Sequence, residues 1–176
     1  MDTWKEFEAN ELTHSAAHHL LAIYHVGLAY GGWARVSDIA RQLNITRGSV
    51  SINLRALKKR AWVETDEHHL VKLTPKGLKA VRSVMAKRVI LKAFLSDVLG
   101  IPDSQAEIDS CKIEHLISRS TGQRLAQFLR FLTASGDPVA KGLVRRFRRF
   151  HGDCPESRTC DVCKGQCLMD ELKRAV

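Results

Sequence analysis

Four of the five cysteines in the sequence lie close together near its C-terminal end. They follow the pattern Cys-x5-Cys-x2-Cys-x3-Cys, formed by Cys154, Cys160, Cys163 and Cys167. Compact cysteine runs are common ligands of iron–sulfur clusters, whereas structural zinc usually takes two ligand pairs separated by a longer stretch. We therefore expect an iron–sulfur cluster here and favour 4Fe-4S over 2Fe-2S. The alternatives are structural zinc, a thiol switch and an unliganded segment.

A second group of residues with metal-binding chemistry lies at Cys111, Glu114 and His115. Residues spaced i, i+3 and i+4 share one face of a helix, and a thiolate, a carboxylate and an imidazole together suit iron, manganese or zinc. His14 and His18, also at helical spacing, could add ligands from an earlier helix. The alternative for these residues is a packed helix with a vestigial site.

Cys111 and His115 could also form the thiolate–imidazole pair of a thiol enzyme. The sequence, however, has no glycine-rich phosphate loop, no nucleophile elbow and no third orienting residue in a fitting context. We therefore expect no enzymatic activity.

Residues 36–60 have the pattern of two short helices joined by a tight turn. Asn44 lies at the turn, and Ser37 and Thr46 could cap the two helices. This is the layout of a helix-turn-helix. Its buried side is expected to comprise Val36, Ile39, Ala40, Leu43, Ile45, Val50, Leu54 and Leu57.

The second of these helices would enter the major groove of DNA with its N-terminal residues near the base edges. Arg47 and Asn53 are the best candidates for reading bases, because they can bind guanine and adenine in bidentate fashion. Hydroxyl side chains near the helix start are better suited to phosphates, and the lysines and arginine at 58–60 add sequence-independent attraction. The residues that we expect to contact DNA are Ser37, Thr46, Arg47, Gly48, Ser49, Ser51, Asn53, Arg55 and Lys59.

Further helices and one hairpin position these residues. We expect a helix at 12–30, strands at 62–65 and 70–73 that form a wing, and a helix from 75 to about 99 that begins with the cap Thr74 and with Pro75. Shorter helices are expected at 104–117, 121–132, from 137 onward and at 169–175. The predicted fold is mainly α: a winged helix-turn-helix domain with a small β-hairpin wing (1–75), an all-helical dimerisation and metal-binding module (76–135), and a basic helix followed by the cysteine-rich tail (136–176).

Composition supports a nucleic-acid partner. The 176 residues include 28 lysines and arginines against 19 acidic residues, which gives a net charge of +9 and a pI near 9.6. We expect no membrane association, because no apolar run approaches the roughly 20 residues needed to span a bilayer. The start of the sequence lacks the features of a secretion signal, so we expect a cytoplasmic protein, and a reducing compartment favours metal binding over disulfides.

The sequence resembles the diphtheria toxin repressor and manganese transport regulator (DtxR/MntR) family of iron- and manganese-dependent regulators. The resemblance spans about residues 12–132 and is carried by ARVSDIARQLNITRGSVSINLRALKKRAWVE, LTPKGLKAVRSVMAKR, LSDVLGIP and, most specifically, SCKIEHLIS. It implies a homodimer that binds a palindromic operator in double-stranded DNA in response to metal.

The resemblance also implies which residues are metal ligands. Cys111, Glu114 and His115 fall on family ligand positions, and His18 stands where the family has methionine or aspartate. Leu21 replaces a family carboxylate, and Arg88 replaces a family histidine. Larger members continue into an SH3-like domain, where this sequence has the cysteine tail.

An arginine cannot bind a metal ion, and its permanent charge repels one. We therefore expect a transcriptional regulator that senses iron or redox state through a cluster on the tail. The basic residues that precede the cysteines could transmit cluster binding or offset the cluster's charge, or could form a solvated helix face: Lys141, Arg145, Arg146, Arg148 and Arg149.

Three alternatives remain open. One is a repressor that binds Fe(II) or Mn(II) directly at the family site and whose tail holds a structural zinc ion. Another is a scaffold or electron-transfer module that uses the winged helix to bind protein. The last is a generic helical bundle with a solvated charged face.

Overall fold

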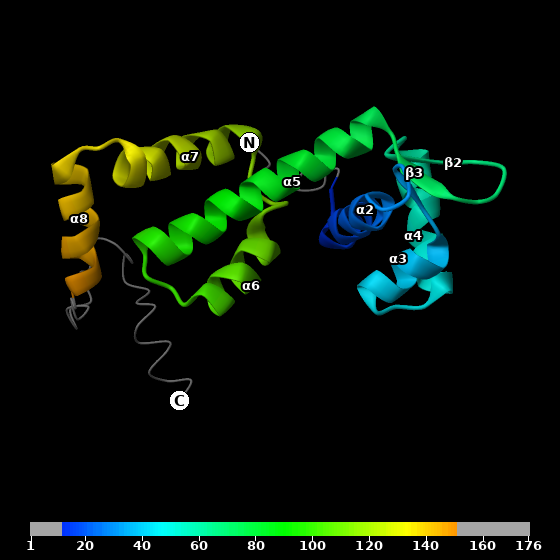
Figure 1. Cartoon of the computed structure of the whole chain (residues 1–176), viewed down its shortest axis with the longest axis horizontal. Helices are drawn as coiled ribbons and strands as arrows, with labels where there is room; N and C mark the ends of the chain where they lie inside the picture. The colour runs from blue at the N-terminus through cyan, green and yellow to red at the C-terminus, as the bar shows by residue number, and fades with distance from the viewer. Residues whose placement is uncertain (1–11, 151–176) are drawn as a thin grey trace, which may run out of the picture.

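The structure is a computed structural model that describes residues 12–150. It is elongated and mainly helical, with a winged-helix unit at one end of the long helix α5 (Pro75–Ala93) and a helical unit along the rest of it (Figure 1). This confirms the predicted fold class. The four tail cysteines and the short helix predicted at 169–175 lie outside the described residues. Among the helices of residues 12–150, none combines the length and apolar character needed to cross a bilayer.

The helix-turn-helix is formed by α3 (Val36–Leu43) and α4 (Arg47–Lys59). Asn44 ends α3 in the left-handed conformation, with a φ of 54°, and the Thr46 hydroxyl accepts a hydrogen bond from the Ser49 amide, so the predicted turn and second cap are confirmed. The predicted Ser37 cap is wrong. Helix α3 begins at Val36, two residues earlier than a Ser37 cap would place it, and the residue at the cap position, Arg35, makes no side-chain cap.

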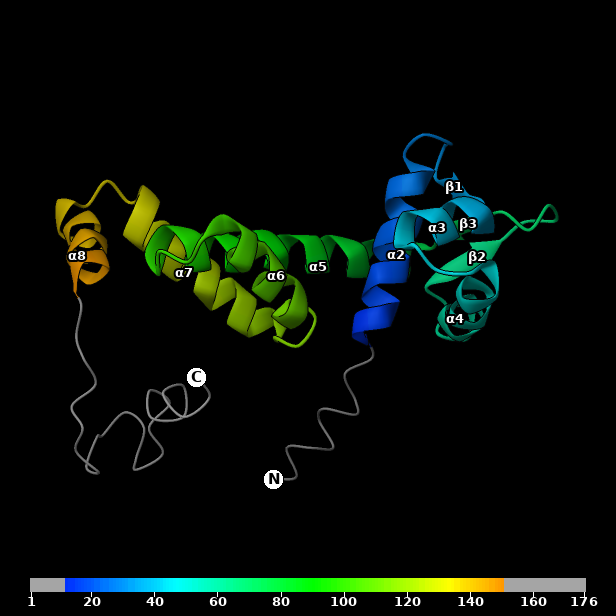
Figure 2. The ribbon, with the colours of Figure 1, turned by 90° about the horizontal axis from the view of Figure 1, so that it is seen from below.

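Helix α2 (His14–Gly27) packs against α3, α4 and α5 and lies at the junction of the two units (Figure 2). Helix α2 ends at Gly27, three residues before the end predicted at residue 30. Gly31 and Gly32, both with positive φ, then lead the chain into the sheet. Ile45 was predicted to be buried but is 39% exposed, because it lies in the turn itself. The core of this unit includes Leu20, Ile23, Ile39, Ala40, Val50, Leu54 and Leu57.

The sheet has three short antiparallel strands in the order β1 (Trp33–Ala34), β3 (Val71–Leu73), β2 (Val63–Thr65). Strands β2 and β3 form the predicted wing. The Asp66 carboxylate holds the turn between them by accepting hydrogen bonds from the amides of His68 and Leu70. Strand β1 was not predicted, because a strand of two residues is too short to show the alternation of apolar and polar residues.

Helix α5 begins as predicted, with the Thr74 hydroxyl accepting from the Gly77 amide. A side chain at Gly77 would place its Cβ 2.0 Å from the Trp62 carbonyl oxygen, so only glycine allows α5 to start this close to the sheet. Instead of remaining α-helical to residue 99, the chain passes into a π-helical turn, η1 (Phe94–Val98).

Helices α6 (Asp103–Ile113) and α7 (Arg119–Ala134) pack against α5. Helix α6 ends at Ile113, four residues before the end predicted at residue 117. The Ser118 hydroxyl caps α7. The first of the predicted ligands, Cys111, therefore lies in the last turn of α6, and Glu114 and His115 follow directly after the helix.

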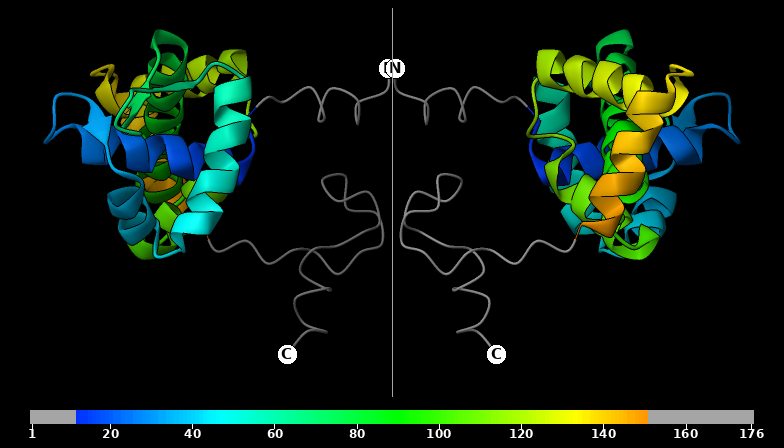
Figure 3. Two further views of the ribbon diagram at one scale, coloured as in Figure 1. Left: turned by 90° about the vertical axis from the view of Figure 1, so that its right-hand side faces the viewer. Right: turned by 90° about the vertical axis from the view of Figure 1, so that its left-hand side faces the viewer.

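Helix α8 (Pro138–Arg149) crosses the far end of the molecule and is capped by Asp137, as predicted (Figure 3). Ala140 packs with Val98 and Leu132 in a second small core. Arg148 donates to the Ser96 carbonyl at 2.7 Å and so ties α8 to η1. The other basic residues of α8 that the sequence singled out are exposed: Lys141, Arg145, Arg146 and Arg149.

Candidate nucleic-acid interface and metal centre

Helix α4 lies at the same end of the molecule as the wing (Figure 1), and its N-terminal half exposes mostly polar residues, with Ile52 as an exposed apolar one. Thr46, Arg47, Gly48, Ser49 and Ser51 are all exposed. The opposite face of α4 carries Val50, Leu54 and Leu57 into the core. This division follows from the 3.6-residue helical repeat, which separates the polar residues from the apolar ones.

The hydroxyl groups of this surface already make local hydrogen bonds. Thr46 Oγ1 and Ser49 Oγ are 2.9 Å apart, and Ser51 Oγ donates to the Arg47 carbonyl at 2.9 Å. Thr46 caps the first turn of α4, and backbone amides at a helix N-terminus favour an anion such as phosphate.

Asn53 is half-buried and points partly toward α2. Its Nδ2 donates to the Ser49 carbonyl at 3.0 Å, and its Oδ1 accepts from the Ser15 hydroxyl at 3.2 Å. Arg47 is exposed. The two predicted base readers therefore differ, since Asn53 would have to give up bonds within the protein before it could bind a base.

The remaining predicted DNA-contacting residues surround this surface. Arg55 and Lys59 are exposed on α4, and Ser37 is half-buried on α3. Lys58 donates to the Thr65 hydroxyl and thereby connects α4 with the wing. The structure thus arranges the predicted residues on and beside one helix.

The predicted family ligands lie where α2, α5 and α6 meet. Glu114 is fully buried and His115 is 8% exposed. The Cys111 sulfur lies 3.3 Å from Nε2 of His18 on α2, a residue 93 positions earlier in the sequence. The structure therefore brings His18 and Cys111 into contact, as the family resemblance implies.

Arg88, on α5, binds two members of this group, Glu114 and Cys111. Its Nε and Nη2 bind the two carboxylate oxygens of Glu114 at 2.6 and 2.9 Å, and Nη2 also donates to the Cys111 sulfur at 3.2 Å. A bidentate arginine–carboxylate pair is a strong, charge-assisted interaction. Because Arg88 uses both oxygens of Glu114, and Leu21 offers no carboxylate, this arrangement does not fit a divalent cation held by Glu114.

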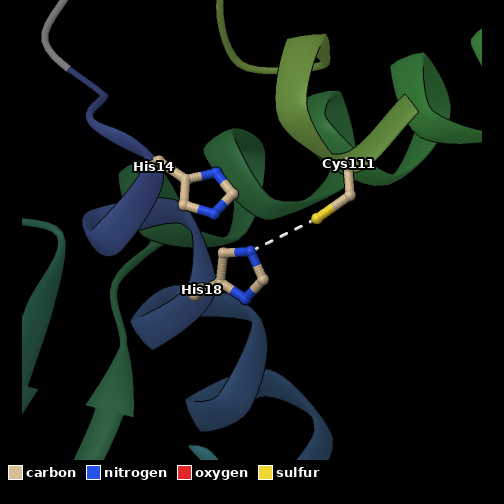
Figure 4. A group of neighbouring side chains, drawn as sticks. All are labelled: His14, His18 and Cys111. Carbon is tan, nitrogen blue, oxygen red and sulfur yellow. Dashed lines mark hydrogen bonds between the residues drawn. The ribbon is translucent and has the colours of Figure 1, made fainter. Parts of the chain in front are cut away.

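Histidines surround the free side of the Cys111 sulfur. The candidate ligand atoms of His14, His18 and Cys111 all lie within 4.8 Å of one another, and the two imidazoles point toward the sulfur (Figure 4). The His14 ring lies 4.4 Å from the ring of His18 and 5.0 Å from that of His115. His14, singled out from the sequence only by its spacing from His18, is thus part of the group.

The local environment favours the neutral forms of these side chains. Burial lowers the pKa of His18 and of His115, and nearby His14 lowers both further. Burial raises the pKa of the Cys111 thiol, and the nearby Glu114 adds to the rise while Arg88 opposes it. A raised thiol pKa is the opposite of what a nucleophilic cysteine needs, so this environment does not support the thiol-enzyme hypothesis.

Comparisons with known proteins identify both parts of the chain. A sequence model of a winged helix DNA-binding domain matches residues 16–77, and a model of the metal binding and dimerisation domain of iron dependent repressors matches residues 74–141. The HTH-type transcriptional regulator MntR of Lysinibacillus sphaericus is 30% identical over 129 residues, which cover 73% of this chain and 91% of that protein.

Two solved structures resemble the fold. The hypothetical protein SSo2273 from Sulfolobus solfataricus aligns with a TM-score of 0.58 and 22% identity, over 67% of this chain and 89% of that one. IdeR from T. acidophilum aligns with a TM-score of 0.52 and 29% identity, over 63% of this chain. The present chain covers 52% of that IdeR chain, or about half of it.

The two matched domains define a winged-helix DNA-binding protein with a helical metal-binding and dimerisation domain. More specifically, the chain belongs to the DtxR/MntR family of metal-dependent transcriptional regulators, and this confirms the family predicted from its motifs.

Proposed function

We propose that the protein is a homodimeric transcriptional regulator that binds a palindromic operator through α4. The observation that carries this proposal is the exposed polar N-terminal half of α4 beside the wing. In this position Arg47 would read a guanine, and Asn53 an adenine after releasing Ser15. Thr46, Ser49 and Ser51 would fix phosphates, with Gly48 close to the DNA backbone.

A two-fold dimer would present two copies of α4 to successive turns of the duplex, about 34 Å apart. The helical unit offers apolar surface for pairing the subunits, since Phe128 and Phe131 on α7 are about half exposed, as is Ile108 on α6. Exposed apolar surface of this kind is typical of protein interfaces.

The experiment that tests DNA binding is a footprint of the full chain on the region upstream of its own gene. Protection of a palindrome that requires a higher protein concentration in Arg47→Ala is the expected result. Failure to protect any DNA under reducing and oxidising conditions, with and without added metal, would favour a protein-binding scaffold instead.

For the signal, we infer that the tail cysteines Cys154, Cys160, Cys163 and Cys167 hold an iron–sulfur cluster that reports iron or redox state. Two observations support this: the compact cysteine spacing, and the pairing of Arg88 with Glu114, which takes the carboxylate away from the family site. The exposed basic residues of α8, just before the cysteines, could offset the cluster's negative charge.

Metal and sulfide analysis of anaerobically purified protein tests the cluster. We expect iron and sulfide in stoichiometric amounts and a change in operator binding after exposure to air. A colourless protein with one zinc ion per chain would contradict the cluster and support a structural zinc tail.

Direct regulation by Fe(II) or Mn(II) is the second candidate function. It is favoured by the convergence of His18, Cys111 and His115 at one place, and opposed by the Arg88–Glu114 pair. Adding Fe(II) or Mn(II) to protein in which all four tail cysteines are replaced by serine separates the two candidates. Restored operator binding would favour direct metal regulation.

A further inference from the structure

A groove between α5 and α7 in the helical unit is lined by four basic side chains. Helix α7 packs along α5 at this place (Figure 1). The groove has a volume of about 380 Å³. Sites for small molecules typically have volumes of about 300 to 1,000 Å³. The residues that give the groove its polar character are Lys79, Arg82, Ser83, Lys87, Arg119 and Gln123.

The helical repeat explains why these side chains meet. Lys79, Ser83 and Lys87 follow one another at intervals of four residues and therefore share one face of α5. Arg119 and Gln123 have the same spacing on α7. The two faces border the same groove, so side chains about 40 positions apart in the sequence become neighbours.

Lys87 is held in place where the two helices approach each other. Its Nζ donates to the Ile117 carbonyl at 2.6 Å, and a Cβ on Gly122 would lie 3.5 Å from its Cγ. An ammonium group has three N–H donors, so two remain for a ligand. Burial lowers the pKa of Lys87, while Glu114 opposes this shift. A bound anion would compensate for the solvation that the ammonium group has lost.

The positive charge of the groove is not balanced within the protein. Among residues 12–150, no carboxylate forms an ion pair with any of its four basic side chains, whereas Lys92 further along α5 pairs with Glu107 at 2.9 Å. Lys79 and Arg82 are three residues apart, a spacing at which like charges on a helix repel. Arg119 is the first residue of α7, whose N-terminus adds partial positive charge. A bound anion would relieve this repulsion.

The side chains of the groove suit a phosphate that is attached to an apolar group. A guanidinium binds phosphate through two parallel hydrogen bonds, and the groove has one arginine on each helix, Arg82 on α5 and Arg119 on α7. Inorganic phosphate alone would leave the apolar part of the groove uncovered. That part is formed by Ala86, Ile90 and Ala126.

We propose that the groove between α5 and α7 binds a small organic phosphate. Arg82 and Arg119 hold the phosphate from the two helices, Lys79 and Lys87 add positive charge, and the apolar part of the groove contacts the organic group. The site lies in the helical unit and uses none of the residues of α4, so it does not depend on the proposed DNA-binding function.

The test measures binding of phenyl phosphate to the full chain by isothermal titration calorimetry, in a phosphate-free buffer of low ionic strength and without DNA. Benzoate keeps the apolar ring but lacks the phosphate, and inorganic phosphate lacks the ring. We expect saturable binding of one phenyl phosphate per chain, with a higher affinity than for either of the other two probes.

Variants of the two arginines assign the phosphate contacts. Arg82→Ala and Arg119→Ala should each weaken phenyl phosphate binding about 10- to 100-fold, as expected for loss of a hydrogen bond to a charged group. The matched control is Arg124→Ala, which removes an exposed arginine of α7 that does not line the groove and bonds Gln127 instead. It should leave binding unchanged.

A further variant separates the groove from its charge. Ala86→Trp places a large side chain in the groove from an exposed position and leaves all four basic side chains intact, so it should abolish binding. Undiminished binding to Ala86→Trp would show that the basic residues attract anions without using the groove, and would overturn the proposal. Circular dichroism of each variant shows whether it is folded.

Three other results would also overturn the proposal: no saturable binding of phenyl phosphate, equal affinity for benzoate, or full affinity in both arginine variants. Gel shifts with unrelated DNA distinguish a macromolecular partner. If phenyl phosphate does not bind but Arg82→Ala and Arg119→Ala weaken binding to that DNA, these arginines contact the DNA backbone instead.

Discussion

The DNA-binding helix α4 and the ligand group between α2, α5 and α6 both carry residues of the family pattern, but they differ in how those residues are held. The N-terminal end of α4 is held mainly by contacts within one helix and its cap, such as the bond from the Ser49 amide to Thr46, although Asn53 also accepts a bond from Ser15 of α2. The ligand group depends on contacts between residues 26 and 93 positions apart, Arg88 with Glu114 and His18 with Cys111. Arg88 therefore determines which partners Glu114 and Cys111 have, and none of its hydrogen bonds within residues 12–150 reaches α4.

The largest expected effect comes from a mutation that breaks the Arg88–Glu114 pair. Arg88→Ala leaves the carboxylate of fully buried Glu114 without its partner, so the free energy of unfolding should fall by about 3 kcal/mol or more. Urea unfolding followed by circular dichroism measures it. The control Lys92→Ala removes an exposed pair with Glu107 from the same helix and should change stability little.

A compensating variant separates the effect of pairing from the effect of packing. Replacing both partners, with Arg88→Met and Glu114→Leu, removes the buried charge and should recover most of the stability that Arg88→Ala removes. If the double variant is as unstable as the single one, packing of the arginine stem rather than the ion pair holds the site together.

The difference between local and long-range contacts also explains what the sequence could predict. The Thr46 and Thr74 caps and the turn at Asn44 depend on residues within a few positions, so local patterns were sufficient to predict them. The replacement of a family ligand by Arg88 was visible in the sequence, but its bidentate bond to Glu114 was not, because it requires α5 and α6 to pack in one particular register.

The next effect tests which residue of α4 reads DNA. Arg47→Ala should weaken operator binding by about 1 to 3 kcal/mol and relax specificity at one base position. Asn53→Ala should cost less, because Asn53 must break its bonds to Ser15 and Ser49 before it binds a base. Gel shifts with single-base operator variants measure both. A larger loss of affinity for Asn53→Ala would mean that Asn53 is released from α2 at little cost.

A smaller effect tests the local stability of α4. Thr46→Ala removes the cap of α4 and should lower the free energy of unfolding by about 1 kcal/mol. The matched control is Thr133→Ala on α7, whose hydroxyl bonds the carbonyl of Leu129 within the helix and contributes no cap. Thermal unfolding of both variants gives the comparison, and equal destabilisation would show that the Thr46 cap adds no stability.

The smallest effect concerns charge alone. Lys59→Ala should weaken binding to operator and to unrelated DNA equally, and should reduce the slope of log affinity against log salt by about 1 for each phosphate that Lys59 neutralises. Lys112→Ala, which removes an exposed lysine from α6, should leave that slope unchanged. If Lys59→Ala instead reduced binding to the operator alone, Lys59 would be reading bases, and the base-reading surface would extend along α4 beyond its N-terminal half.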